Sequence, residues 1–195
     1  MNFLAHLYLS GENEGIRLGN FIADAVKGQD ILKYNPEVRQ GIILHRKIDE
    51  FTDVHNIVRS GKSRLYSRYG KYSAVIIDIF YDHFLAVNWK SFSSVPYDTF
   101  VKGCYKTLLN NQPLLPDKVS DYLPHMIEMD WLGNYIHLSG IERTLYGMSR
   151  RAKHQNNIDK SIEILHSNFA DFESEFLKFF PELIKFVKNE GIILI

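Results

Sequence analysis

Acidic and histidine side chains recur at helical spacing in the first half of the chain. His45 and Asp49 are four residues apart, and Asp78 and Asp82 repeat that spacing. Residues four positions apart project from the same face of an α-helix. Such faces could bring several carboxylate and imidazole groups to one site, which is the arrangement that a metal-dependent hydrolase needs.

Asp78 and Asp82 lie in an otherwise strongly apolar segment, residues 74–85. A carboxylate on a buried helix is costly to desolvate unless a cation or hydrogen-bond donors compensate for the lost water. Several carboxylates at one site would also repel one another without a metal ion or another cation. Histidine and aspartate ligands without thiolates favour Mn²⁺, Fe²⁺ or Zn²⁺ over a calcium cage built only from oxygen atoms.

Each of these residues also has a simpler interpretation. Asp53 could cap a following helix, and Asp49 could form an exposed ion pair with a neighbouring base. Asp24 could pair with Lys27, and His6 is interpreted as a core histidine with a backbone partner. These separate explanations account poorly for the accumulation of acids and histidines in apolar helices of one half of the chain.

A basic stretch follows the central histidine and aspartate residues. Between residues 54 and 77 there is no acidic side chain. The basic residues in this stretch are Arg59, Lys62, Arg64, Arg68 and Lys71. A charge run of this kind is usually a solvated helix face. The alternative is a surface that binds phosphate groups or an acidic protein.

The elements that position these side chains are helical nearly throughout, which predicts a single all-α domain over residues 1–195. Asn35 and Pro36 are typical of a helix start, because Asn caps well and Pro lacks only an N–H that is unpaired at that position. A second helix is expected over 72–89, after Gly70. In the C-terminal third the apolar residues recur at three- and four-residue intervals, and Pro181 is expected to restart the helix after a kink.

Composition excludes several classes of protein. The 195 residues include 23 Lys and Arg and 23 Asp and Glu, so the formal net charge is +0 and a globally basic nucleic-acid binder is disfavoured. The single cysteine, Cys104, excludes an internal disulfide framework and a zinc cluster built on thiolates. The apolar N-terminus lacks the basic residues of a signal peptide, and no segment approaches the ~20 apolar residues of a membrane span. We therefore expect a soluble, cytoplasmic protein with no membrane partner.

Four motifs make the chain recognisable. They are MNFLAHL at 1–7, GNFIAD at 19–24, GIILHRKIDEFTDVH at 41–55 and DIFYDHFLAVNW at 78–89. In these motifs, and in similarity that continues to the C-terminal FFPEL segment, the chain resembles the acyl carrier protein phosphodiesterase family. The resemblance implies a manganese-dependent, all-α fold distantly similar to the HD-type metal phosphohydrolases. It also implies hydrolysis of the phosphodiester that joins 4′-phosphopantetheine to a serine of holo-acyl carrier protein.

With that activity in view, the candidate residues receive roles. The candidate metal ligands are Asp24, His45, Asp82 and His83, with Asp49 and Asp78 as further ligands or as groups that orient them. Asp53 is expected to orient the attacking water or to act as general base, and His55 to protonate the leaving serine oxygen. Arg46 is expected to hold a non-bridging phosphate oxygen with its planar guanidinium. Mn²⁺ is the expected ion, although Mg²⁺, Fe²⁺ or Zn²⁺ could replace it.

Acyl carrier proteins are acidic, so the basic stretch is expected to steer one towards the site. Two alternatives stay open at this point. The chain could be a metal phosphohydrolase of a small nucleotide-like substrate, which would use the same ligands. It could also be a non-catalytic helical module that binds an acidic protein, in which case its carboxylates would be structural.

Overall fold

The computed structural model describes residues 1–152 and 156–192, and these residues form an all-α fold with no strand. The predicted all-α fold class is therefore confirmed. The α-helices are α1 (Phe3–Tyr8), α2 (Glu14–Ile22), α3 (Pro36–Val54), α4 (Asn56–Tyr69), α5 (Ser73–Val87), α6 (Tyr97–Asn110), α7 (Asp117–Glu128), α8 (Leu138–Arg151), α9 (Ser161–Ser167) and α10 (Phe169–Asn189). Short 3₁₀ segments join them, including η1 (Ala23–Ala25) after α2 and η6 (Gly133–Ile136) before α8.

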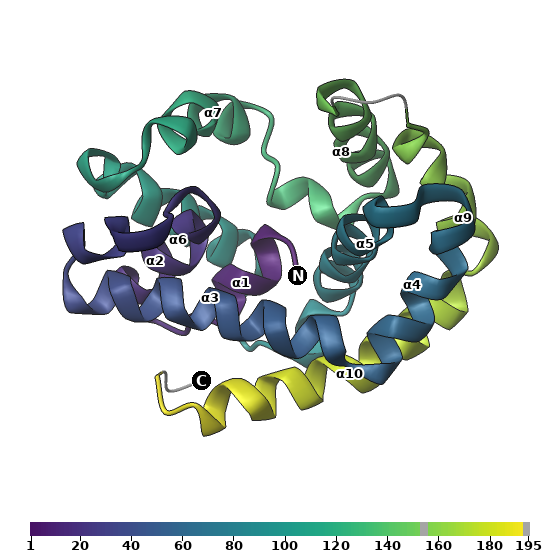
Figure 1. Ribbon diagram of the computed structural model, residues 1–195, viewed down its shortest axis with the longest axis horizontal. Coiled ribbons are helices and arrows are strands. Elements are labelled where there is room, and N and C mark those ends of the chain that lie inside the picture. The colour runs from purple at the N-terminus through teal and green to yellow at the C-terminus, as the bar shows by residue number, and fades with distance from the viewer. Residues whose placement is uncertain (153–155, 193–195) are drawn as a thin grey trace.

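Helix α1 lies in the middle of the molecule, with α2 and α3 on one side and α5 on the other (Figure 1). Its residues 4–8 are buried. None of the helices among the described residues is long and apolar enough to cross a membrane.

Helices α2 and α3 form the most extensive helix pair of the fold. The side chain of Asn35 accepts a hydrogen bond from the Val38 amide, 2.9 Å away, so α3 begins with the predicted asparagine cap. Gly19 of α2 and Gly41 of α3 face each other where the two backbones cross. A Cβ on either glycine would collide with a carbonyl oxygen of the opposite helix. This close crossing fixes the position of α3 against α2.

The apolar helix predicted over 72–89 is α5, flanked by 3₁₀ turns. Gly70 has a positive φ of 49°, which ends α4 and separates it from α5. Both carboxylates of α5, those of Asp78 and Asp82, point towards the first residues of the chain. Asp82 is fully buried, and it accepts hydrogen bonds from the backbone amides of Leu4 and Ala5.

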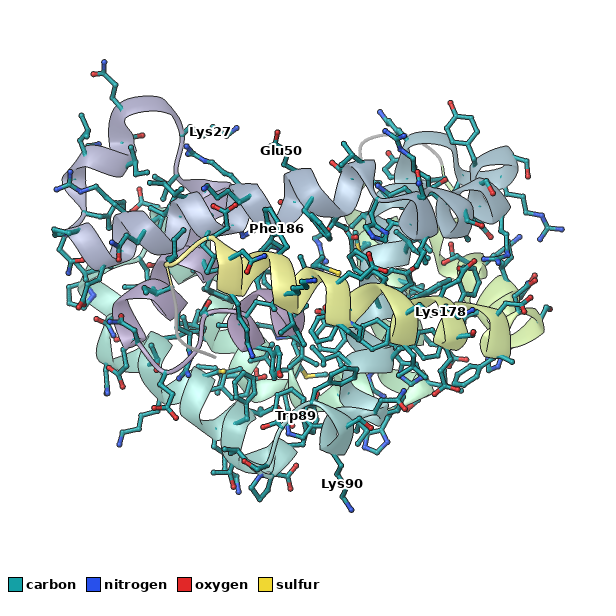
Figure 2. The ribbon with its side chains drawn as sticks, turned by 90° about the horizontal axis from the view of Figure 1, so that it is seen from below. Lys27, Glu50, Trp89, Lys90, Lys178 and Phe186 are labelled. Atoms are coloured by element: carbon teal, nitrogen blue, oxygen red, sulfur yellow. The ribbon has the colours of Figure 1, made fainter. Side chains whose placement is uncertain are left out.

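Helix α10 runs across one face of the molecule and packs on α3, α4 and α5 (Figure 2). Phe186 stacks on Phe51 of α3 with ring centroids 4.5 Å apart. The predicted restart at Pro181 is wrong, because α10 continues through this residue to Asn189. Phe179, Phe180 and Leu183 are fully buried on either side of the proline, and their burial outweighs the one backbone hydrogen bond that Pro181 cannot make.

Candidate metal centre

Two histidines from different helices stack against each other at the centre of the molecule. The rings of His6 on α1 and His45 on α3 are 3.9 Å apart and nearly parallel. Asp49, one turn after His45, lies beside both rings: its Oδ1 is 3.2 Å from His6 Nε2 and its Oδ2 is 3.2 Å from His45 Nε2. Within residues 1–152 and 156–192, these three residues form the one group of His, Cys, Asp and Glu side chains with ligand atoms all within 4.8 Å.

Asn20 on α2 orients both imidazoles through their Nδ1 atoms. His6 Nδ1 lies 2.8 Å from the Asn20 side-chain oxygen, and His45 Nδ1 lies 2.8 Å from the Asn20 backbone oxygen. The Asn20 amide nitrogen donates in turn to the His6 carbonyl, 2.9 Å away, and to Ser10 Oγ, 2.9 Å away. This is the outer-shell arrangement of metal-binding histidines, in which Nδ1–H is held by an acceptor and Nε2 is left for the ion.

The Nε2 atoms of His6 and His45 are free to bind a metal ion. Both are buried, and neither makes a well-aligned hydrogen bond with any described residue, although the Asp49 oxygens are close. Leaving a buried polar atom without a hydrogen bond is costly, so two such atoms aimed at one carboxylate need an explanation. A divalent cation between them would supply the missing partner. The residues present therefore fit a metal ion with nitrogen and oxygen ligands.

Protonation of the histidines reflects the charges around them. Burial, together with the neighbouring His45, lowers the pKa of His6 to about 4. Burial also opposes the charge on His45, but Asp24 and Asp49 outweigh it and raise its pKa to about 9. Burial opposes the charge on Asp49 too, yet the two histidines hold the pKa of this carboxyl well below its usual range. Without a metal ion, one proton on His45 therefore neutralises Asp49.

Two further acids border the centre. Asp24, in η1, places Oδ1 at 3.4 Å from His45 Nε2, and its side chain is 83% exposed. Asp78 lies 3.3 Å from the α-amino group of Met1, which is also 3.5 Å from Asp49 Oδ1. Burial raises the pKa of Asp78, whereas the Met1 ammonium favours its charged form. The centre is thus most open to solvent at Asp24, whereas the side chain of Asp78 is only 22% exposed and the α-amino group of Met1 is buried.

A family model described as acyl carrier protein phosphodiesterase matches residues 1–183, which include every residue of this centre. The chain belongs to the acyl carrier protein phosphodiesterase family. Among its relatives are proteins named acyl carrier protein phosphodiesterase from Photorhabdus laumondii, Serratia proteamaculans and Yersinia pestis. Each is 30% identical to it. The match covers 97% of this chain and 96% of the Photorhabdus protein, and 98% of this chain and 100% of each of the other two. No solved structure matches this member of the family.

The structure brings together some of the predicted ligands of this family member. His45 and Asp49 belong to the centre, with Asp24 at its edge. Asp82 does not reach it with its carboxylate, which instead accepts the amides of α1. His83 is not a member of this group either: its Nδ1 is 2.7 Å from the Tyr135 carbonyl oxygen in η6, its ring packs against aromatic side chains, and its Nε2 is buried without a hydrogen bond to any described residue.

The predicted catalytic residues lie on or next to α3 and have partners within the protein. Asp53 is two helical turns from His45 and forms an ion pair with Lys62 at 2.7 Å. His55 Nε2 lies 3.2 Å from Glu182 on α10. The Arg46 guanidinium donates to the Val26 carbonyl oxygen at 3.3 Å.

The basic stretch forms α4 and the turn after it, and its members differ in their surroundings. Arg64 makes a two-pronged ion pair with Glu175 of α10, with distances of 2.8 and 2.6 Å. Arg59, Arg68 and Lys71 are exposed. An acidic partner would therefore find these three side chains more available than Arg64.

His6 and Asn20 were not among the residues predicted for the site, although both belong to the candidate centre. The interpretation of His6 as a core histidine is correct for its burial, but its Nδ1 partner is the Asn20 side chain rather than a backbone group. The sequence did contain a pattern that pointed to both residues. Asn20 and Asp24 are four residues apart, as are Asn2 and His6, and both pairs lie in motifs that carry the resemblance to the family.

Proposed function

We propose that this protein is a cytoplasmic, Mn²⁺-dependent phosphodiesterase that releases 4′-phosphopantetheine from holo-acyl carrier protein and leaves the apo-protein. The observation that carries the metal dependence is the pair of buried Nε2 atoms, on His6 and His45, that face Asp49 without an aligned hydrogen bond. Membership of the family, and the names of the relatives, support the substrate.

His6, His45 and Asp49 would hold the cation, and Asp24 would complete or adjust the site from its exposed side. A divalent cation held there would supply two kinds of chemistry: a lower pKa for water and compensation of the charge on the phosphoryl oxygens. Asn20 keeps both imidazoles in the orientation and tautomer that present Nε2. The carboxylate of Asp49 lies beside both rings and would offset the charge of a cation held between them. The Met1 ammonium neutralises Asp78 behind Asp49, so that this acid adds little repulsion to a phosphate anion.

The remaining roles stay predictions. Asp53 lies about 6 Å along the helix axis from Asp49, at 1.5 Å per residue, and is proposed to orient the attacking water or to accept its proton. His55 is proposed to protonate the serine oxygen, and Arg46 to hold a non-bridging phosphate oxygen. His83 is the weakest of the proposed ligands because, among the described residues, it belongs to no group of three or more ligand atoms within 4.8 Å, although its Nε2 is buried without a hydrogen bond like those of His6 and His45. Asp78 and Asp82 are proposed to support the centre.

The α4 surface is proposed to attract the carrier protein through Arg59, Lys62, Arg64, Arg68 and Lys71. Attraction between a basic patch and an acidic protein raises the association rate and weakens as salt increases.

The experiment that tests the proposal is a mass measurement on holo-acyl carrier protein incubated with the purified enzyme and Mn²⁺. We expect conversion to the apo-protein, its loss with excess chelator, and its loss in His45→Ala. His125→Ala is the matched control, because His125 is an exposed histidine on α7. Failure to release phosphopantetheine with Mn²⁺, Mg²⁺, Fe²⁺ or Zn²⁺ would overturn the proposed activity.

A further inference from the structure

A small cavity lies directly beside the candidate metal centre. Its volume is about 100 Å³, and aromatic side chains from three helices line it: Phe3 of α1, Phe21 of α2 and Tyr122 of α7. The ring centroid of Phe3 lies 5.3 Å from that of Phe21 and 6.3 Å from that of Tyr122. We call this cavity the aromatic slot.

Asp24 borders both the aromatic slot and the candidate metal centre. Asp24 lines the slot, and its Oδ1 lies 3.4 Å from His45 Nε2. Burial, together with the charge of Asp24, raises the pKa of Tyr122 to about 12, so the tyrosine is a neutral wall next to this carboxylate. A substrate with its phosphate at the centre would therefore place the atoms next to the phosphate in the slot.

Size limits what the slot can hold. A cavity of roughly 150 Å³ accepts a benzene ring, and sites for whole small molecules begin at about 300 Å³. At about 100 Å³ the slot is smaller than either, so it cannot enclose a nucleoside. It suits a compact, branched apolar group of a few carbon atoms.

Charge at the slot is suited to an anionic substrate. Lys118 of α7 is exposed and also lines the slot. An ammonium group there can attract a phosphate towards the centre and offset the charge of Asp24. The slot thus joins an apolar interior to one positive and one negative group.

We propose that the aromatic slot binds the dimethyl-substituted carbon of the phosphopantetheine arm, and so selects the arm side of the phosphodiester. This inference rests on the proposed function, because the arm is the substrate there. The dimethyl-substituted carbon is separated from the phosphate oxygen by a single CH₂ group, so it must lie beside the centre when the phosphate is bound. The serine side of the diester leads into a protein backbone, which is far larger than a cavity of about 100 Å³.

The test compares two holo-acyl carrier proteins, one with the natural arm and one whose arm carries hydrogens in place of the two methyl groups. For the wild-type enzyme we expect kcat/KM to be roughly tenfold to a hundredfold lower with the dimethyl-free arm, as for apolar groups lost from a fitted pocket. Tyr122→Ala should lower kcat/KM for the natural arm and abolish the preference between arms. Tyr122→Phe keeps the wall and should keep the preference.

Tyr146→Ala is the control, because Tyr146 is an exposed tyrosine on α8 and is 59% exposed. It should leave both activities at the wild-type level. Equal kcat/KM for the two arms with wild-type enzyme overturns the slot assignment while the proposed function stands. So does an unchanged preference in Tyr122→Ala.

Calorimetry with free 4′-phosphopantetheine and its dimethyl-free analogue separates the two failures. If the wild-type enzyme releases neither arm, the proposed function fails and the binding preference alone decides the slot. We expect the natural compound to bind roughly tenfold more tightly to the wild type. Equal binding of the two compounds rejects the slot assignment even if Tyr122→Ala proves too unstable to assay.

Discussion

Asp82 Oδ2 lies 2.7 Å from the backbone nitrogen of Leu4, which is 78 positions earlier in the chain. Its other oxygen lies 3.2 Å from the Ala5 nitrogen, so one buried carboxylate satisfies two of the unpaired amides in the first turn of α1. His6 follows one residue later. Asp82 therefore holds the helix that carries one of the proposed ligands, and its link to the candidate metal centre is indirect.

Asp82→Ala should lower the free energy of unfolding of the metal-free protein by about 1–3 kcal/mol, because two buried amides lose their acceptor. It should also weaken Mn²⁺ binding, because α1 is less firmly held. Urea denaturation and calorimetry measure the two effects. Asp82→Asn keeps one acceptor oxygen and should fall in between. Asp98→Asn, at an exposed site in the first turn of α6, is the control. A variant Asp82→Ala with wild-type stability would contradict this reading.

Asp49→Asn should abolish stoichiometric Mn²⁺ binding, whereas Asp53→Asn should retain it. Asp49 contacts both histidines, but Asp53 is exposed and pairs with Lys62. Metal analysis after dialysis measures the ion content, and circular dichroism checks that both variants are folded. Loss of the ion in Asp53→Asn together with its retention in Asp49→Asn would show that the ion binds further along α3.

Mn²⁺ affinity should rise with pH. In the metal-free protein the pKa of His45 is about 9, so at neutral pH the ion must displace a proton from this ring. We expect the association constant to increase roughly tenfold per pH unit between about pH 6.5 and 8.5, with one proton released. Calorimetry in two buffers of different ionisation enthalpy counts that proton. An affinity that is flat over this range would mean that His45 binds the ion without giving up a proton.

The raised pKa of His45 also predicts how the stability of the metal-free protein depends on pH. The pKa of His45 is raised from 6.5 to about 9 by folding. Its protonated form therefore stabilises the metal-free protein fully below about pH 6.5, and this contribution is lost as the pH rises through about 9. The difference in unfolding free energy between wild type and His45→Gln should shrink over that interval. A constant difference would contradict the assigned charge.

Charge reversal should separate two residues of the basic stretch. Arg64→Glu should cost roughly 1–2 kcal/mol of stability, because it breaks the pair with Glu175 and removes a guanidinium 5.0 Å from the Phe172 ring. Arg68→Glu should leave stability within about 0.5 kcal/mol and lower kcat/KM for acyl carrier protein at low salt. Thermal unfolding and assays across ionic strength distinguish them. A kcat/KM that ignores both salt and Arg68→Glu would remove the steering hypothesis.

Local spacing and capping were enough to predict the all-α fold and the start of α3 at Asn35. The partnership of His45 with Asp49 also followed from their position one turn apart on α3. Which distant segments meet was beyond local pattern: Asp82 was expected beside His45 but accepts the amides of α1, and His6 came from an apolar run with no acid near it in sequence. Pro181 was misjudged for a related reason, because only tertiary burial shows that α10 can absorb a missing hydrogen bond.

The crossing at Gly19 and Gly41 restricts which amino acids the chain tolerates at these two positions. Because no side chain fits at either position, even Ala would force the two backbones apart. Asn20 follows Gly19 directly, and His45 is one turn beyond Gly41, so a wider crossing would separate the asparagine from the ring that it orients. A library of all substitutions at these two positions should therefore return almost only glycine when selected for metal binding. The absence of a side chain at Gly19 and Gly41 is therefore as necessary for the geometry of the candidate centre as the proposed ligands themselves.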